Sequence, residues 1–197
     1  TQDGGIEAMR RRLADPALKD RLDREIADNI RRRGGAASLL ITSGDYRGKT
    51  LEQVAADAGA SPVETARQIA LKGDARLASF NMREDDIRAF MTRPWVVTSS
   101  DATQGHPRRF GTFPQKFAQF VRGEHLMTTE QFVHRSSGLT AEIFGLEGRG
   151  FVREGYAADL VVFDPKRLAA RADYVSPELF SVGVVTVVVN GKLAVAS

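Results

Sequence analysis

Apolar side chains recur every three or four positions through the first 33 residues, which is the spacing of one face of an α-helix. They are Ile6, Met9, Leu13, Leu18, Leu22, Ile26 and Ile30. Asp15-Pro16 breaks the run, because Pro16 suits the first turn of a helix and Asp15 can cap it. We therefore predict helix over residues 6–33, interrupted at Asp15-Pro16 and ended by Gly34-Gly35.

Strands and helices then alternate along the chain. Thr50 with Gln53 three residues later is a capping-box signal, and Ser61-Pro62 with Glu64 repeats it, so we predict that a helix begins at each. The other predicted elements are strands at 38–42, 77–82 and 95–99 and a helix at 84–91. Such alternation is typical of a βαβ architecture and places the chain in the α/β class.

The pattern changes near residue 147. The predicted elements on either side of this point are a loop at 101–111, helices at 114–122 and 129–144, and β-rich runs at 158–164 and 184–190. Asn190-Gly191 is a strong hairpin signal and predicts two antiparallel strands within residues 186–195. We place a boundary near residue 147, between an α/β part (1–147) and a small β part (148–197).

Composition is that of a globular protein. Hydrophobic residues make up 42% and charged residues 27% of the 197 positions, and no apolar run is long enough to cross a bilayer, so we expect no membrane partner. The net charge is only +3, and the arginine runs at 10–12 and 31–33 stand among acids at helical spacing. That is typical of a solvated helix face, so we expect no nucleic-acid partner. The absence of cysteine excludes disulfides and thiolate chemistry, and we expect a reducing, cytoplasmic location.

Residues 43–50 have features of a nucleotide site. They end in Gly48-Lys49-Thr50, follow an apolar strand and open a helix, as a phosphate-binding loop does. That motif requires its first glycine where the chain has Ser43, and Gly44 lies one position late. Because the N–H groups of such a loop must converge on one phosphate, the shift favours an ordinary polar loop and leaves nucleotide binding as a remote alternative.

The three histidines do not form a metal-binding motif. His106, His125 and His134 are scattered, and no two of them have the His-x-His or His-x-x-x-His spacing. We expect His134 on a helix surface and His125 in a short loop. No complete metal site can be assembled from these residues, so we expect no stoichiometric metal binding by this chain alone.

Candidate chemistry is concentrated after the predicted strand at 95–99. Asp101 follows this strand, and His106, Arg108 and Arg109 come in the next loop. In α/β barrels the C-terminal ends of the strands carry the chemistry, so a carboxylate there can bind a metal ion or accept a proton from a metal-bound water. A helix cap, or a salt bridge from Asp101 to one of the two arginines, explains the segment equally well.

The segment around Asp101 resembles a known family. Ser100-Asp101 and the run His-Pro-Arg-Arg-Phe-Gly-Thr-Phe-Pro at 106–114 are similar to the last barrel strand and following loop of the N-acyl-D-amino-acid deacylases (D-aminoacylases) of the amidohydrolase superfamily. Further similar segments cover nearly the whole chain: 80–87, 136–146, 148–150, 155–164 and 189–191. The resemblance implies an α/β fold that is the C-terminal portion of a (β/α)8 amidohydrolase barrel, with part of a small β-sandwich domain.

The resemblance also implies roles for three residues. Asp101 would be the catalytic aspartate, which takes a proton from a zinc-activated water and passes it to the leaving amine, and a candidate metal ligand. His106 and Arg108 would bind substrate, whose carboxylate and acyl carbonyl attract cationic or donor groups. Members of the family usually have glycine after the aspartate, where this chain has Ala102.

The remaining metal ligands of the family have no counterpart in this chain. We therefore expect a longer protein that holds zinc and hydrolyses the amide bond of a small N-acyl amino acid or a related acylated amine. The expected partner is a missing N-terminal half, as a separate chain or within the same one, or a second copy. The alternative is a catalytically inactive fragment or interaction unit that lacks the metal ligands.

Overall fold

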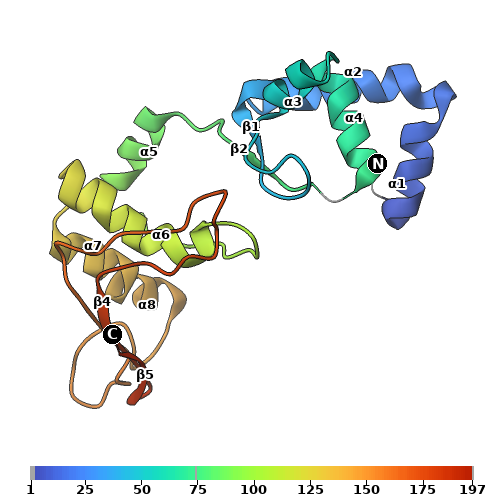
Figure 1. Ribbon diagram of the computed structural model, residues 1–197. Helices are drawn as coiled ribbons and strands as arrows, with labels where there is room; N and C mark the ends of the chain where they lie inside the picture. The colour runs from blue at the N-terminus through green and yellow to red at the C-terminus, as the bar shows by residue number, and fades with distance from the viewer. Residues whose placement is uncertain (1–2, 74, 197) are drawn as a thin grey trace. The chain divides into compact units, whose positions relative to one another are not determined.

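The fold is mixed α/β and divides into two compact units. A computed structural model describes residues 3–73 and 75–196, and its units comprise residues 1–82 and 83–197 (Figure 1). Each unit combines helices with short antiparallel strands. In the described part of the chain, no helix has both the length and the apolar character that a bilayer crossing requires.

Some helices of the first unit begin at residues whose side chains cap them. Its elements are α1 (Gly5–Ala14), the 3-10 helix η1 (Pro16–Leu18), α2 (Lys19–Arg32), the 3-10 helix η2 (Ala36–Ser38), β1 (Leu39–Ile41), α3 (Leu51–Asp57), α4 (Pro62–Lys72) and β2 (Leu77–Ser79). Asp15 accepts a hydrogen bond from the N–H of Ala17 and caps η1, so the predicted break between the helices is confirmed. Thr50 and Gln53 form the predicted capping box of α3, with hydrogen bonds of 3.2 and 2.8 Å.

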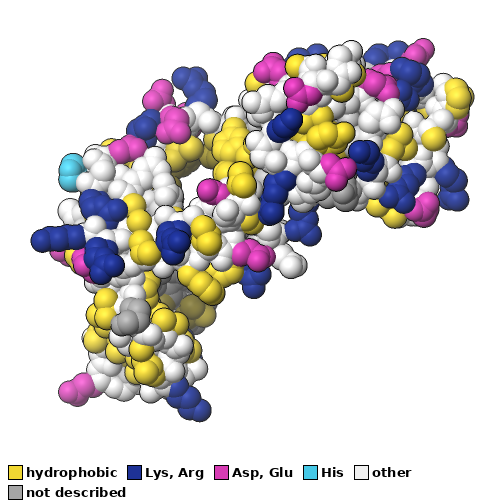
Figure 2. Space-filling model, in the orientation of Figure 1, with side chains coloured by type: hydrophobic (Ala, Val, Ile, Leu, Met, Phe, Trp, Pro, Cys, Tyr) yellow, Lys and Arg dark blue, Asp and Glu magenta, His cyan; other side chains and the backbone are white. Residues whose placement is uncertain are grey.

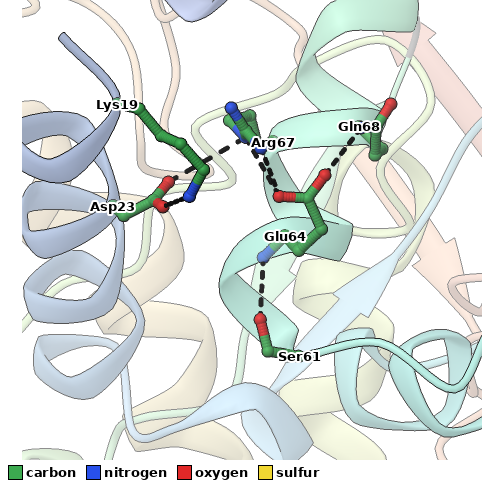
Figure 3. Close-up of polar contacts among 6 residues, drawn as sticks. All are labelled: Lys19, Asp23, Ser61, Glu64, Arg67 and Gln68. Atoms are coloured by element: carbon green, nitrogen blue, oxygen red, sulfur yellow. Dashed lines mark hydrogen bonds and ion pairs between the residues drawn. The ribbon is translucent and has the colours of Figure 1, made fainter. Parts of the chain in front are cut away.

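A polar network joins α2 to α4 (Figure 3). Its members are Lys19, Asp23, Ser61, Glu64, Arg67 and Gln68. Ser61 caps α4 by accepting a hydrogen bond from the N–H of Glu64 at 3.1 Å, as predicted. Hydrogen bonds from Gln68 and Arg67 lower the pKa of the Glu64 carboxyl. Arg67 also lies 3.9 Å from Asp23, so one guanidinium connects the two helices.

The core of the first unit lies between its strand pair and its helices. The predicted strands at 38–42 and 77–82 form as the shorter β1 and β2, which pair antiparallel with Leu39 opposite Ser79 and Ile41 opposite Leu77. The buried residues of this core are Leu39, Ile41, Leu51, Val54 and Ile69.

The second unit contains more helix than strand. Its elements are α5 (Glu84–Met91), α6 (Arg108–Lys116), the π-helix η3 (Phe117–Gly123), α7 (Thr129–Ser136), α8 (Gly138–Phe144), β3 (Leu160–Phe163), β4 (Val184–Val189) and β5 (Lys192–Ala196). The helix predicted at 129–144 is interrupted at Ser137. At this point the backbone lies close to Phe151, since a Cβ atom at Gly138 would lie 2.7 Å from its ring.

Two predictions for the segment before α6 are wrong. Residues 95–99 form no strand, since they have no ladder partner in the described part of the chain. The predicted strand–helix–strand unit across residues 77–99 is therefore absent. The loop predicted at 101–111 is shorter than expected, because α6 begins at Arg108 rather than near Pro114.

Aromatic rings hold the second unit together. Phe117 is buried and makes edge-to-face contacts with Phe132 of α7 at 5.1 Å and with Phe163 of β3 at 5.4 Å. Leu168 completes this core from the connection between β3 and β4. The helices and the sheet of the second unit therefore share one core. The boundary predicted near residue 147 separates a part of a barrel from a part of a small β domain. It stays a prediction.

The sheet of the second unit has the strand order β3-β4-β5 and is antiparallel throughout. Asn190 and Gly191 both have positive φ, at 49° and 75°, so the predicted hairpin turn is confirmed. Asp159 supports this turn by accepting a hydrogen bond from the N–H of Asn190 at 2.8 Å. Apolar side chains remain exposed on the strands (Figure 2), namely Leu160, Val161, Val162, Val185, Val189, Leu193 and Val195.

Candidate functional site

Asp101 lies at a sharp turn and presents its carboxylate to solvent. Its φ of 42° is in the left-handed region, which Asp tolerates better than most residues. The Asp101 N–H donates to Ser99 Oγ at 3.3 Å, and Thr103 Oγ1 donates to the Asp101 carbonyl at 3.1 Å. The side chain is 82% exposed. The turn thus directs this carboxylate away from the protein interior.

Arg108 pairs with this carboxylate from the first turn of α6. Its Nη2 lies 2.8 Å from Asp101 Oδ2 and donates to Thr103 Oγ1 at 2.7 Å. The Nε of Arg108 is buried and has no hydrogen-bond partner among the described residues. Arg109 is exposed, and its guanidinium lies over the ring of Phe110. Of the two arginines that the sequence offered, Arg108 forms the salt bridge.

His106 has one ring nitrogen fixed by the backbone. Its Nδ1 accepts a hydrogen bond from the N–H of Arg108 at 3.1 Å, so the neutral ring carries its proton on Nε2. Burial lowers the pKa of His106, as does the positive charge of Arg108, while Asp101 raises it. At neutral pH the imidazole is therefore uncharged and offers Nε2–H as a hydrogen-bond donor.

Tyr174 packs against His106 and was not predicted. The two rings meet edge to face, with centroids 5.1 Å apart, and burial raises the pKa of the Tyr174 hydroxyl. This part of the connection between β3 and β4 is fastened to α6, because Ser181 Oγ donates to the carbonyl of Phe110 at 2.7 Å. Nothing in the local sequence around Tyr174 indicates this contact, since it joins residues far apart along the chain.

A buried lysine lies behind the site. Lys116 is 5% exposed and donates to Thr98 Oγ1, three residues before Asp101. Burial lowers the pKa of Lys116 to about 8, and the charge of Arg135 acts in the same direction. The sequence held a signal for it, because Lys116 lies three residues after Phe113 and four before Phe120, on the apolar face of its helix.

The described residues do not assemble a metal site. No group of three or more His, Asp or Glu side chains in this part of the chain could hold a metal ion. His125 and His134 are exposed, in a loop and on α7 as predicted. Asp101 alone of the predicted site residues has the chemistry of a hard metal ligand, and it pairs with Arg108.

The backbone N–H groups and the lysine of the loop before α3 bind to other groups of the protein. Gly48 N–H donates to the carbonyl of Ile41 at 2.8 Å, and Lys49 N–H donates to the carbonyl of Tyr46 at 3.1 Å. The Lys49 ammonium lies 2.7 Å from the Asp57 carboxylate. A phosphate-binding loop needs these amides and this ammonium for its ligand, so the geometry does not favour nucleotide binding.

The fold is similar to part of a solved deacylase structure. A crystal structure of N-acyl-D-glutamate deacylase from Bordetella bronchiseptica, complexed with zinc and a phosphonate inhibitor, matches 83% of this chain with a TM-score of 0.73 and 34% sequence identity. The match covers 35% of that protein. The mixed α/β fold therefore corresponds to part of a deacylase.

The sequence comparison identifies the family. The model of the amidohydrolase family matches residues 6–195, and the chain belongs to this family. It is 36% identical over 151 residues to the D-aminoacylase of Alcaligenes xylosoxydans xylosoxydans, and 32% identical over 169 residues to the N-acyl-D-aspartate deacylase of that organism. These matches cover 75% and 82% of this chain but 31% and 33% of the relatives. The chain thus spans about a third of the length of the curated relatives it matches.

Proposed function

We propose that this chain is the C-terminal part of a zinc-dependent amidohydrolase that hydrolyses the amide bond of N-acyl-D-amino acids or related acylated amines. The observation that carries the proposal is the convergence of the three predicted residues. Arg108 pairs with Asp101 through its guanidinium and holds His106 through its backbone N–H. A carboxylate, a cation and a neutral N–H donor thus lie together at the start of α6, and two of the relatives are named as deacylases of N-acyl-D-aspartate and N-acyl-D-glutamate.

Each group has a distinct task in the proposed reaction. The Asp101 carboxylate accepts a proton from the attacking water as the water oxygen bonds to the acyl carbon. The same carboxyl then gives this proton to the amide nitrogen, the C–N bond breaks, and a carboxylic acid and an amine leave. His106 donates Nε2–H to the acyl carbonyl oxygen, where negative charge develops. Arg108 exchanges Asp101 for the substrate carboxylate, which a guanidinium binds with two hydrogen bonds.

The zinc ion of the complete enzyme needs ligands from outside the described residues. Asp101 could contribute one oxygen, but it belongs to no group of three or more potential ligands in this part of the chain. Zinc bound there would polarise the acyl carbonyl and lower the pKa of a bound water. The place of Asp101 at the turn and the resemblance support its proton-transfer role.

The rest of the proposed fold follows from the same resemblance. Residues 1–147 would contribute to a (β/α)8 barrel and residues 148–197 to a small β domain. The exposed apolar side chains on β3, β4 and β5 support this, because an uncovered apolar sheet favours association. Additional strands from a longer chain, a separate N-terminal chain or a second copy would cover them. We propose the cytoplasm as the location.

The test is hydrolysis of N-acetyl-D-amino acids by the natural gene product, with its zinc content measured in parallel. Replacement of Asp101 by Asn should lower kcat by about 10³-fold or more, because the asparagine side chain cannot take up the proton of the attacking water. The matched control is Asp86→Asn, an exposed aspartate in the first turn of α5, which should leave kcat unchanged. An active Asp101→Asn enzyme would remove the catalytic assignment.

The alternative is that the chain acts as a non-catalytic interaction unit. The lack of a metal-ligand group among the described residues favours it. A gene product of this length that binds no zinc and hydrolyses no N-acyl amino acid, even when mixed with a separately produced N-terminal part, would establish that alternative. Zinc binding and turnover by the mixture would exclude it.

A further inference from the structure

The segment that leads to Asp101 lacks the support that a strand ordinarily has. Between the end of α5 at Met91 and the turn at Asp101, no residue belongs to a ladder in the described part of the chain. Trp95 is 68% exposed. A carboxylate that transfers protons must nevertheless be held within a fraction of an ångström of its working position. Side chains from the later helices supply fixed points in place of a ladder.

The first fixed point lies at the start of the segment. Arg135 of α7 is 5% exposed, and its Nη1 donates to the carbonyl of Met91 at 2.6 Å. Met91 is the last residue of α5, so its carbonyl is among those left without a partner inside the helix. The guanidinium therefore caps α5 and fixes the point from which the segment departs.

The second fixed point lies near Asp101. Lys116 of α6 is as buried as Arg135, and its Nζ donates to Thr98 Oγ1. Lys116 has no carboxylate partner among the residues that the structure describes. A buried ammonium of this kind costs stability, and the positive charge of Arg135 adds to that cost. Packing alone therefore does not explain a lysine here, because a methionine of similar length would fill the same space without a charge. What the lysine adds is a donor for Thr98.

We propose that Lys116 is a positioning residue for the proposed reaction: its hydrogen bond to Thr98 fixes the segment that carries Asp101. Lys116 itself does not touch the reacting atoms. The inference rests on the proposed function for its kinetic consequence. Its structural consequence, the order of residues 98–101, can be measured whether or not the enzyme turns over.

The structural test compares hydrogen exchange in the natural gene product and its variants, followed by mass spectrometry on a peptide that covers residues 96–107. Lys116→Met and Thr98→Val each remove the hydrogen bond while keeping the shape. Loss of a bond from a charged donor should speed exchange in this peptide by about tenfold or more. Thr98→Ser keeps the hydroxyl and should exchange as the wild type does. The control Lys166→Met removes an exposed lysine of the same unit and should change nothing.

The kinetic test uses the same variants in hydrolysis of an N-acetyl-D-amino acid. Lys116→Met and Thr98→Val should each lower kcat by roughly tenfold with little change in KM, because substrate binding by His106 and Arg108 is retained. The double variant should be no slower than either single variant, since both remove one interaction.

The outcomes separate this inference from the proposed function. Exchange in residues 96–107 that is equally slow in Lys116→Met, Thr98→Val and Lys166→Met would overturn the positioning role. If Lys116→Met fails to fold, Thr98→Val carries the test alone. A wild-type product without hydrolytic activity would remove the proposed function, and the exchange comparison would still determine whether Lys116 orders the segment.

Discussion

The guanidinium of Arg108 lies against the carboxylate of Asp101, with Nη2 2.8 Å from Oδ2. The same residue donates its backbone N–H to His106, so the conformation of Arg108 determines how both other residues of the loop are presented. Arg108 is the first residue of α6, and the helix therefore fixes the backbone of the arginine. The loop is organised around this residue rather than around Asp101.

Replacement of Arg108 by lysine should raise KM for N-acyl-D-amino acids by roughly tenfold or more, because an ammonium cannot make the paired hydrogen bonds that a guanidinium makes to a carboxylate. The matched control is Arg109→Lys, since Arg109 is exposed at the next position. Steady-state kinetics of the two variants measure the difference. Equal KM values for both would show that Arg108 does not bind the substrate carboxylate.

His106 should give the reaction an acidic limit. Burial and Arg108 hold the pKa of His106 below 6.5, so the ring is neutral above that value and becomes protonated as the pH falls through its lowered pKa. Protonated Nδ1 can no longer accept from the Arg108 N–H. In His106→Asn the amide oxygen can still cap the N–H of Arg108, but Nε2–H is lost. We expect kcat/KM to fall several-fold and this acidic limb to vanish from its pH profile.

Stability measurements test the same assignment. Because the folded pKa of His106 is lower than the unfolded value, the unfolded chain binds more protons between the two values, and stability decreases as the pH falls through that interval. Urea unfolding at a series of pH values below 6.5 should show a smaller decrease for His106→Asn than for the wild type. The same pH dependence in both proteins would contradict a lowered pKa.

Because Lys116 is buried, the free energy of unfolding should rise with pH in the alkaline range. Its pKa is about 8 in the folded state and 10.5 in a solvated lysine, so the unfolded chain binds the extra proton between these values and stability rises with pH across this interval. Below about pH 8 the folded state bears the full cost of the buried charge. Lys116→Met should therefore raise the free energy of unfolding at pH 7 by roughly 1–3 kcal/mol and abolish the alkaline rise.

Lys116→Met is thus expected to be more stable than the wild type and yet to have a lower kcat. A destabilised Lys116→Met protein would mean that the hydrogen bond to Thr98 outweighs the cost of burying the charge. Chemical denaturation at pH 7 and pH 9.5 distinguishes the two cases. Lys166→Met again serves as the control, and its free energy of unfolding should change with pH as that of the wild type does.

Ser61→Ala should lower the free energy of unfolding by about 1 kcal/mol, because it removes the hydroxyl that accepts from the N–H of Glu64 at the start of α4. Ser61→Thr keeps this hydroxyl and should recover most of the loss. Denaturation followed by circular dichroism measures both variants. A Ser61→Ala protein as stable as the wild type would show that the network between α2 and α4 does not depend on this cap.

Local signals in the sequence predicted local structure well. The break at Asp15-Pro16, the capping box at Thr50 and the turn at Asn190-Gly191 all form where they were expected. Each depends on atoms within about four residues of one another, so the sequence contains everything that determines it. The motif at 106–114 likewise pointed to the amidohydrolase family, to which the chain belongs.

Pairings between distant residues were not determined by the sequence. The segment at 95–99 has the composition of a strand but no ladder, because strand formation requires a neighbour and none is present in the described part of the chain. Tyr174 lies against His106 only because the connection between β3 and β4 is fastened to α6. Similarly, α6 begins at Arg108 where a loop was expected, and Thr103 contributes to the turn without any signal in its neighbours.

The sequence by itself determined which groups are available: one carboxylate, one imidazole and two arginines on a short segment. Tertiary structure decided what each group does there. It placed Tyr174 against the ring of His106, lowered the pKa of that imidazole by burial, and buried Lys116 behind the segment. The physical reason is that burial and the pKa values that depend on it are fixed only when distant parts of the chain pack together.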